Sequence, residues 1–164
     1  MRRLTINGKR NYIFGLFMVC VIVILAWYIS GNYYQLLLIS GNSMLPAFHD
    51  LQIVILDKHS KKYNYNDVVA FRCDGLNAVL VKRIVACPGD TVWIDAGTLY
   101  VNGSISTVFP QENQFEYEGI TQTALHLEKN QYFLVGDNIT ESKDSRYEEV
   151  GCVEEKDMIG KVIE

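Results

Sequence analysis

The sequence predicts one mainly β domain that follows a single transmembrane helix. A long apolar segment near the N-terminus contains no charged residue. Behind it, short apolar and β-branched runs alternate with Gly, Asn and Asp, which is typical of strands joined by turns. No segment of this second part keeps the 3.6-residue period of an amphipathic helix. With 164 residues the chain can bury a core of its own and carry one appendage.

The N-terminal segment has the length and the flanks of a membrane anchor. Residues 13–29 include no charge and span about 25 Å as a helix, at the short end of what a bilayer requires. Tyr12 and Trp27 suit the two membrane–water interfaces. Residues 1–11 carry four cations and no acid, so we expect them to form a cytoplasmic basic tail. The anchor is predicted at 12–30, and everything after it is expected outside the cytoplasm.

A cleaved signal peptide is the main alternative to an anchor. It would share the basic start, but its apolar region is usually shorter, and the end of this one, WYISGNYY, has no clean small-x-small cleavage site. A helix buried in a protein core is disfavoured because the segment has no polar face. We therefore interpret the segment as an uncleaved signal anchor.

Residues 31–164 are expected to form one compact β-rich domain. The dipeptide Asn102-Gly103 is a strong signal for a tight turn, so a hairpin is predicted at 99–105. Residues 104–131 are polar with scattered aromatics and predict a loop-rich insertion, either a flap toward a substrate or a plain surface excursion. Further strands are predicted at 35–39, 52–56, 68–72, 79–86, 91–94 and 132–135.

Charge and cysteine usage exclude several kinds of partner. The chain has a net charge of −4 although its first eleven residues carry +4, so the main body is acidic and nucleic acid is not expected as a partner. No pair of cysteines forms a CxxC motif, so neither a zinc site nor a thioredoxin-type site is indicated. The cysteines are interpreted most simply as small buried hydrophobic residues, with one disulfide bond as an alternative. No cofactor is predicted. The cysteines are Cys20, Cys73, Cys87 and Cys152.

Ser43 lies in the turn-like stretch SGNSMLP. The stretch is not a G-x-S-x-G elbow, because Leu45 stands where the second glycine would be. A Ser-His-Asp triad stays open since triads assemble from distant positions, but no histidine is marked by an orienting carboxylate. Taken alone, Ser43 is interpreted most simply as a turn serine. The three histidines are His49, His59 and His126.

Lys82 changes the interpretation of Ser43, because it stands inside the apolar run VLVKRIV. In a strand, Lys82 and Arg83 point to opposite faces, and both faces are otherwise apolar. An edge-strand lysine with its head in water is the simple alternative. If burial brought the lysine pKa from about 10.4 to near neutrality, at a cost of about 4 kcal/mol, the neutral amine could take the proton of the Ser43 hydroxyl. Backbone N–H groups at the serine turn could then receive the oxyanion.

A third stretch, residues 136–146, follows the predicted strand 132–135 and is dense in turn-forming and charged residues. Its simplest interpretation is a loop with an internal Asp144–Arg146 ion pair. A Ca²⁺ site is disfavoured because the EF-hand spacing and its closing glutamate are missing, and no metal is predicted.

Together these stretches resemble the bacterial type I signal peptidases of the short Gram-positive kind, over nearly the whole chain. The similarity is carried by motifs in the order found in that family, which is far more specific than any one of them. They are the N-terminal anchor, Ser43-Met44-x-Pro46, Asp67-Val68-Val69-Ala70-Phe71, Lys82-Arg83-Ile84-Val85 with Pro88-Gly89-Asp90, Gly136-Asp137-Asn138, and Ser142-x-Asp144-Ser145-Arg146.

The resemblance implies a signal-peptidase-like β domain, related to self-cleaving repressors, with a serine–lysine dyad at the outer face of the membrane. Ser43 matches the nucleophile and Lys82 the general base. Ser142 matches a residue that helps to position the lysine, and Asp144 and Arg146 match an ion pair behind the site.

The family cuts exported preproteins after a small-x-small sequence, so the resemblance also implies shallow pockets near the nucleophile. By position, their lining residues are Leu37, Ile39, Met44 and Val81. One departure concerns the oxyanion: some members carry a serine two positions before the nucleophile, where this chain has Gly41. A second is Ala86-Cys87, where the family often has Gly-Leu.

The predicted function is therefore a single-pass membrane signal peptidase that acts through an acyl-enzyme, with exported preproteins and the lipid bilayer as partners. An assembly factor or chaperone with little proteolysis, for example in pilus building, is the alternative, and secretion or pilus machinery is a further possible partner. A self-cleaving repressor is disfavoured because an anchor stands where its DNA-binding domain would be.

Overall fold

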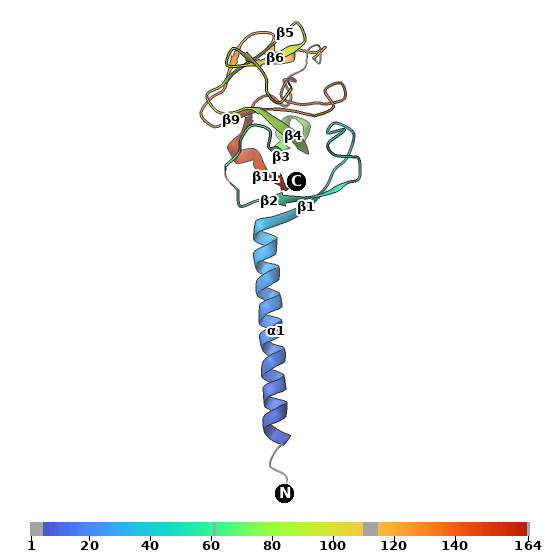
Figure 1. Ribbon diagram of the computed structural model, residues 1–164, viewed down its shortest axis with the longest axis vertical. Helices are drawn as coiled ribbons and strands as arrows, with labels where there is room; N and C mark the ends of the chain where they lie inside the picture. Colours follow the sequence, from blue (N-terminus) through green and yellow to red (C-terminus); the bar gives the residue numbers. More distant parts are fainter. Residues whose placement is uncertain (1–4, 61, 110–114, 164) are drawn as a thin grey trace.

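The structure is a computed structural model that describes residues 5–60, 62–109 and 115–163. A long helix, α1 (Thr5–Tyr33), projects from one end of a β domain and continues directly into its first strand (Figure 1). Within it, Asn11–Tyr33 has a mean hydropathy of 2.6 and is long and apolar enough to cross a membrane. The predicted anchor, residues 12–30, lies inside this helix.

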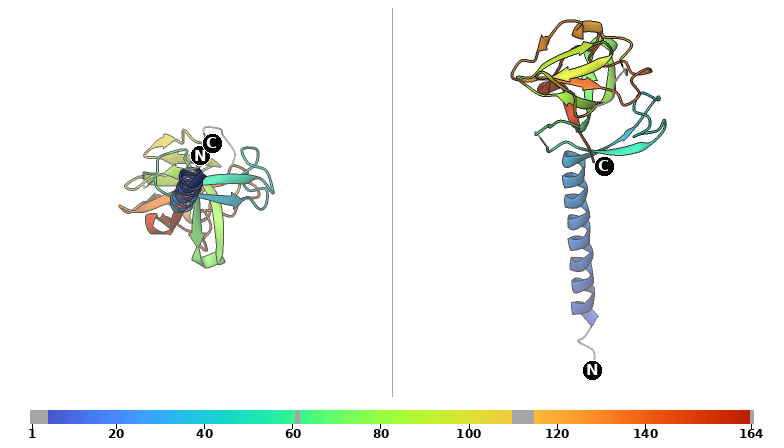
Figure 2. Two further views of the ribbon diagram at one scale, coloured as in Figure 1. Left: turned by 90° about the horizontal axis from the view of Figure 1, so that it is seen from below. Right: turned by 45° about the horizontal axis from the view of Figure 1, so that its top comes forward.

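Seven strands form one antiparallel sheet, in the order β1-β2-β11-β3-β4-β9-β10. The order begins beside α1 and moves up the domain (Figures 1 and 2). Strands β1, β2, β3, β4 and β9 cover apolar and β-branched runs that the sequence predicted as strands, whereas β10 and β11 were not predicted. The bounds are β1 (Tyr34–Leu38), β2 (Ile53–Asp57), β3 (Val68–Cys73), β4 (Ala78–Ala86), β9 (Gln131–Val135), β10 (Val153–Glu154) and β11 (Met158–Ile163), with 3₁₀ turns η1 (Asp74–Leu76) and η3 (Glu155–Asp157).

A second, four-stranded antiparallel sheet lies at the end of the domain away from α1, in the order β7-β6-β5-β8 (Figure 1). The predicted hairpin is confirmed: β6 pairs with β7 through Asn102 and Gly103, both at positive φ as a type I′ turn requires. The mainly β fold class is confirmed with it. The bounds are β5 (Thr91–Asp95), β6 (Thr98–Val101), β7 (Ser104–Ile105) and β8 (Leu125–His126).

The polar segment 104–131 belongs to this second sheet through β7 and β8. It also includes one 3₁₀ turn, η2 (Gly119–Thr121), and residues 110–114 lie outside the described part. Phe115 and Leu127 are buried in one apolar core with strands β5, β6 and β9. The described residues of the segment, 104–109 and 115–131, are therefore packed onto the domain.

The cysteines are four free thiols. Cys73 is buried among the apolar side chains of β3, β4 and β9, as expected of a small hydrophobe, whereas Cys20 is exposed on α1. Cys87 and Cys152 are partly buried, and burial raises the pKa of each thiol to about 11, with nearby carboxylates acting in the same direction. A raised pKa keeps these thiols protonated and unreactive near neutral pH.

Candidate functional site

Ser43 stands in the turn between β1 and β2. Gly41, at φ +89°, begins the turn and donates its N–H to the Asp50 carboxylate, 2.7 Å away. Met44 and Phe48 are buried in the apolar core beneath β2 and β3, and Met44 is only 1% exposed. Because these side chains fix the turn on the core, Ser43 itself is left half-buried with its hydroxyl beside β4.

Lys82 is brought to Ser43 by strand β4. Its Nζ lies 2.7 Å from Ser43 Oγ and 3.0 Å from the carbonyl oxygen of Val81. Only 3% of the lysine is exposed, so the edge-strand alternative with a solvated ammonium is wrong. The two residues that the sequence singled out for chemistry are thus in hydrogen-bond contact, although 39 positions separate them.

Burial lowers the pKa of Lys82 from 10.5 to about 8, against the opposing effect of the Asp144 and Asp137 carboxylates. Removal from water disfavours the charged ammonium form and lowers the pKa, and the two carboxylates raise the pKa by less than burial lowers it. At pH 7 the neutral fraction of such a lysine is about 10%, compared with about 0.03% for a solvated one. Lys82 can therefore act as a proton acceptor near neutral pH.

Ser142 lies next to this pair, but it makes no hydrogen bond that would hold the lysine. Its Oγ is buried and has no hydrogen-bond partner within the described part of the chain. Gly136 makes the close packing possible, since a Cβ at this position would collide with Ser142 Oγ and with the carbonyl oxygen of Ser43. The positioning of Lys82 by Ser142 stays a prediction.

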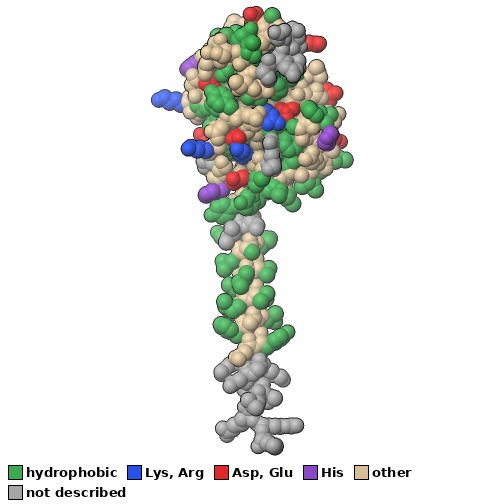
Figure 3. Space-filling view, viewed as in Figure 1, with side chains coloured by type: hydrophobic (Ala, Val, Ile, Leu, Met, Phe, Trp, Pro, Cys, Tyr) green, Lys and Arg blue, Asp and Glu red, His purple; other side chains and the backbone are tan. Residues whose placement is uncertain are grey.

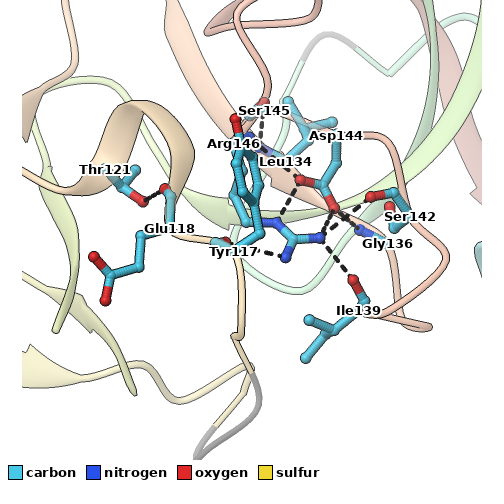
Figure 4. Close-up of polar contacts among 10 residues, drawn as sticks. All are labelled: Tyr117, Glu118, Thr121, Leu134, Gly136, Ile139, Ser142, Asp144, Ser145 and Arg146. Atoms are coloured by element: carbon cyan, nitrogen blue, oxygen red, sulfur yellow. Dashed lines mark hydrogen bonds and ion pairs between the residues drawn. The ribbon is translucent and has the colours of Figure 1, made fainter. Parts of the chain in front are cut away.

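Asp144 and Arg146 form the ion pair that the sequence suggested, and both are almost fully buried. Arg146 Nε and Nη2 donate to the Asp144 carboxylate at 2.8 and 2.9 Å. The guanidinium also donates to the carbonyl oxygens of Ile139 and Ser142 (Figure 4). Asp144 in turn accepts the Gly136 N–H at 3.1 Å. The pair therefore ties both ends of the 136–146 loop together behind Ser43.

A second ion pair at the site was not anticipated from the sequence. Arg83 Nε and Nη2 donate to the two carboxylate oxygens of Asp137 at 2.7 and 2.6 Å, a bidentate contact. Arg83 follows Lys82 on β4 and leaves the strand on its opposite face. A signal was present: a cation next to Lys82 in an apolar strand needs an acid, and Asp137 is the second residue after β9, the strand that pairs with β4.

The loop also holds the serine turn from the side through Asn138. Its backbone N–H donates to Ser43 O at 3.0 Å, and its side-chain Nδ2 donates to Asn42 O at 3.1 Å. No role had been predicted for Asn138, because its partners are backbone atoms 95 or more positions away and carry no sequence signal.

The four residues expected to line substrate pockets belong to one apolar cluster around the turn. Leu37 and Val81 are partly exposed, whereas Ile39 and Met44 are buried in the cluster. Their contact with a substrate stays a prediction.

The histidines lie elsewhere: the His59 ring packs against Tyr33, His126 contacts Thr91, and His49 is exposed. None of them contacts Ser43, so the triad alternative has no support. Among the residues described, no group of three or more His, Cys, Asp or Glu could hold a metal ion.

The chain is similar to a known protein family, to curated relatives and to a solved structure. Residues 10–164 match the family described as "Signal peptidase, peptidase S26". Signal peptidase I of Bacillus licheniformis is 32% identical, over 94% of this chain and 88% of the relative. Signal peptidase I T of Bacillus subtilis (strain 168) is 29% identical, over 87% and 78%. The crystal structure of a signal peptidase I from Enterococcus faecalis V583 superposes with a TM-score of 0.50 at 30% identity, over 62% of this chain and 97% of that one.

Proposed function

The chain belongs to the signal peptidase family S26 and is a type I signal peptidase, a serine endopeptidase; on this premise we propose that Ser43 and Lys82 are its catalytic dyad. The single observation that carries the proposal is the 2.7 Å contact between Ser43 Oγ and a buried lysine whose pKa is lowered to about 8. An assembly factor without proteolysis would have no need of a lysine kept near neutrality at this cost.

The proposed reaction has two halves. In the first, Lys82 Nζ takes the proton of Ser43 Oγ, which attacks the carbonyl carbon of the scissile peptide bond. The lysine then gives this proton to the leaving amine, the C–N bond breaks, and the signal peptide stays on Ser43 as an ester. In the second half, water attacks the ester, its proton passes through Lys82 to Ser43 Oγ, and the signal peptide leaves with a new carboxylate.

The oxyanion of both steps is proposed to lie at the N–H of Ser43. Gly41 has no side-chain donor, and its backbone N–H is already taken by Asp50. The Ser43 N–H donates to no acceptor within residues 5–60, 62–109 and 115–163. A free donor on the nucleophile itself is well placed to meet a developing negative charge.

The topology is proposed from α1 and from the foot of the β domain. Hydrophobic side chains gather where the domain meets the helix (Figure 3), which supports a domain resting at the membrane surface. The four cations before residue 11 support a cytoplasmic N-terminus and a catalytic domain on the outer side. The exposed apolar residues of the strands nearest α1 include Leu36, Leu38, Ile53, Ile55 and Ile163.

Substrates are proposed to be exported preproteins that are cut after small-x-small sequences. The proposed position of the β domain at the membrane surface supports this, because a signal peptide held in the bilayer would present its C-terminal end near that surface. A dedicated secretion or pilus machinery as partner stays a prediction of the sequence.

The detergent-solubilised full chain should cleave a model preprotein, and N-terminal sequencing of the product should place the cut directly after a small residue. The Ser43→Ala variant is the control and should leave the preprotein intact. A wild-type protein that leaves a range of preproteins uncut, or a cut that persists in Ser43→Ala, would contradict the proposal.

The pH dependence of cleavage follows from the pKa of Lys82. Because only the neutral amine accepts a proton, kcat/KM should rise with pH along one limb with an apparent pKa of about 8 and level off above it. Asp137 acts to raise this pKa, so Asp137→Asn should move the limb to lower pH. Rates on a peptide without titratable side chains test this, and a limb near 10.5 in the wild-type protein would argue against a desolvated base.

A further inference from the structure

Asn138 holds both peptide groups that flank the nucleophile. Its backbone N–H reaches the carbonyl oxygen of the 43–44 peptide at 3.0 Å. Its side-chain amide reaches the carbonyl oxygen of the 42–43 peptide at 3.1 Å. One residue from the 136–146 loop thus contacts the chain on either side of Ser43, although the two segments are far apart in the sequence.

The second of these contacts concerns the peptide that supplies the proposed oxyanion donor. The 42–43 peptide is trans, so its carbonyl and its N–H point in opposite directions. The side chain of Asn138 holds the carbonyl, and the Ser43 N–H therefore points away from Asn138. A rotation of this peptide would turn the N–H away from the reacting carbonyl and would break the bond to Asn138 at the same time.

Other contacts keep the Asn138 amide in place. Thr140 Oγ1 donates to Asn138 Oδ1 at 3.0 Å, which leaves Nδ2 facing Asn42. The bidentate Arg83–Asp137 pair fastens the preceding residue to β4, the strand that also carries Lys82. Lys82, the proposed proton acceptor, and Arg83, which holds the residue before Asn138, are thus neighbours on one strand. Leu45 N–H also donates to Asn42 O at 3.1 Å, so the carbonyl keeps one bond when Asn138 is changed.

We infer that Asn138 is a positioning residue, whose side chain fixes the 42–43 peptide so that the Ser43 N–H stabilises the oxyanion. The inference rests on the proposed function of Ser43 as the nucleophile. Asn138 acts through the peptide and touches no reacting atom. Loss of the Asn138 side chain should therefore reduce the stabilisation of the transition state and leave substrate binding unchanged.

The test is Asn138→Leu in the full chain, assayed on the pH plateau where Lys82 is neutral. We expect kcat to fall about 10- to 100-fold, somewhat less than the loss of a whole oxyanion donor, with KM changed less than about twofold. A peptide aldehyde ending in Ala-x-Ala serves as the probe: Ser43 Oγ adds to its carbonyl carbon, the oxygen becomes the oxyanion, and the serine proton moves to Lys82. Its inhibition constant should rise by the same factor as kcat falls.

Matched variants separate this role from folding and from the dyad. Asn130→Leu, at an exposed asparagine remote from the turn, should change neither kcat nor the inhibition constant. Thr140→Val, on an exposed residue, should show a smaller loss of the same kind and remains testable if Asn138→Leu does not fold. Unchanged kcat, or a loss of kcat without weaker aldehyde binding, would overturn the inference. An active Ser43→Ala variant would instead overturn the proposed function. An inactive Ser43→Ala variant together with a fully active Asn138→Leu variant would refute only the positioning role of Asn138.

Discussion

Replacing Lys82 with methionine should lower kcat for preprotein cleavage by about 10³-fold or more, without unfolding the protein. Methionine has nearly the length of lysine and suits a site that is only 3% exposed, so the packing should survive. What it lacks is the amine that lies 2.7 Å from Ser43 Oγ and that is proposed to accept the proton. Lys82→Ala should be equally inactive. Lys82→Arg should fail too, because a guanidinium stays protonated at any pH at which the protein is folded.

The measurement is cleavage of a model preprotein under single-turnover conditions, together with thermal unfolding of each variant. Lys156→Met, at an exposed lysine away from the site, is the matched control and should keep full activity. Ser40→Ala, at an exposed serine three positions before Ser43, is the control for Ser43→Ala. Full activity of Lys82→Ala would rule out the dyad, whatever the result for Ser43.

Removal of the Asp144 carboxylate should have the largest effect on stability. Asp144→Ala leaves the buried Arg146 guanidinium without a counter-ion and the Gly136 N–H without an acceptor. Breaking one side of a buried ion pair typically costs about 3–5 kcal/mol. Both residues are at most 1% exposed, so water cannot take the place of the carboxylate without a rearrangement of the 136–146 loop. Since that loop carries Asn138 and Ser142, cleavage should fall together with stability.

Urea unfolding of the solubilised protein, followed by tyrosine and tryptophan fluorescence, measures the change. Glu149→Ala breaks the exposed pair with Lys143 and should leave the free energy of unfolding unchanged. The double variant Asp144→Ala, Arg146→Met should recover part of the loss, because no unpaired buried charge remains. A stability of Asp144→Ala equal to wild type would show that the pair does not hold the loop.

The sequence predicted the elements well where local chemistry determines them. The charge-free segment became α1, the β-branched runs became strands, and Asn102-Gly103 became a turn because few other residues adopt positive φ on two successive positions. The segment 104–131 was only partly predictable. Strand β7 was predicted as part of the hairpin at 99–105, whereas β8 is recognisable as a strand only by its pairing with β5.

The contacts of the candidate site were likewise predictable from the sequence only in part. Asp144 and Arg146 are two positions apart, so their pairing could be expected from the sequence. Arg83 and Asp137 are 54 positions apart, so the signal for their pairing can be interpreted only once the order of the strands is known. Asn138 contacts backbone atoms, which leave no pattern in the sequence. Cavities and accessible surface also depend on the whole fold, which is why Ile39 and Met44 were expected at a pocket surface but are buried.

The sequence alone indicates a long apolar helix with the length of a membrane anchor, a β-rich domain, and two residues in unusual surroundings: a serine in a tight turn and a lysine in an apolar strand. That the two meet follows from the fold, because antiparallel pairing of β3, β4 and β9 sets where Lys82 points, and packing of Met44 sets where Ser43 lies. Burial, a property of the assembled core, then lowers the pKa of Lys82 to about 8, which is what the proposed role as a base requires.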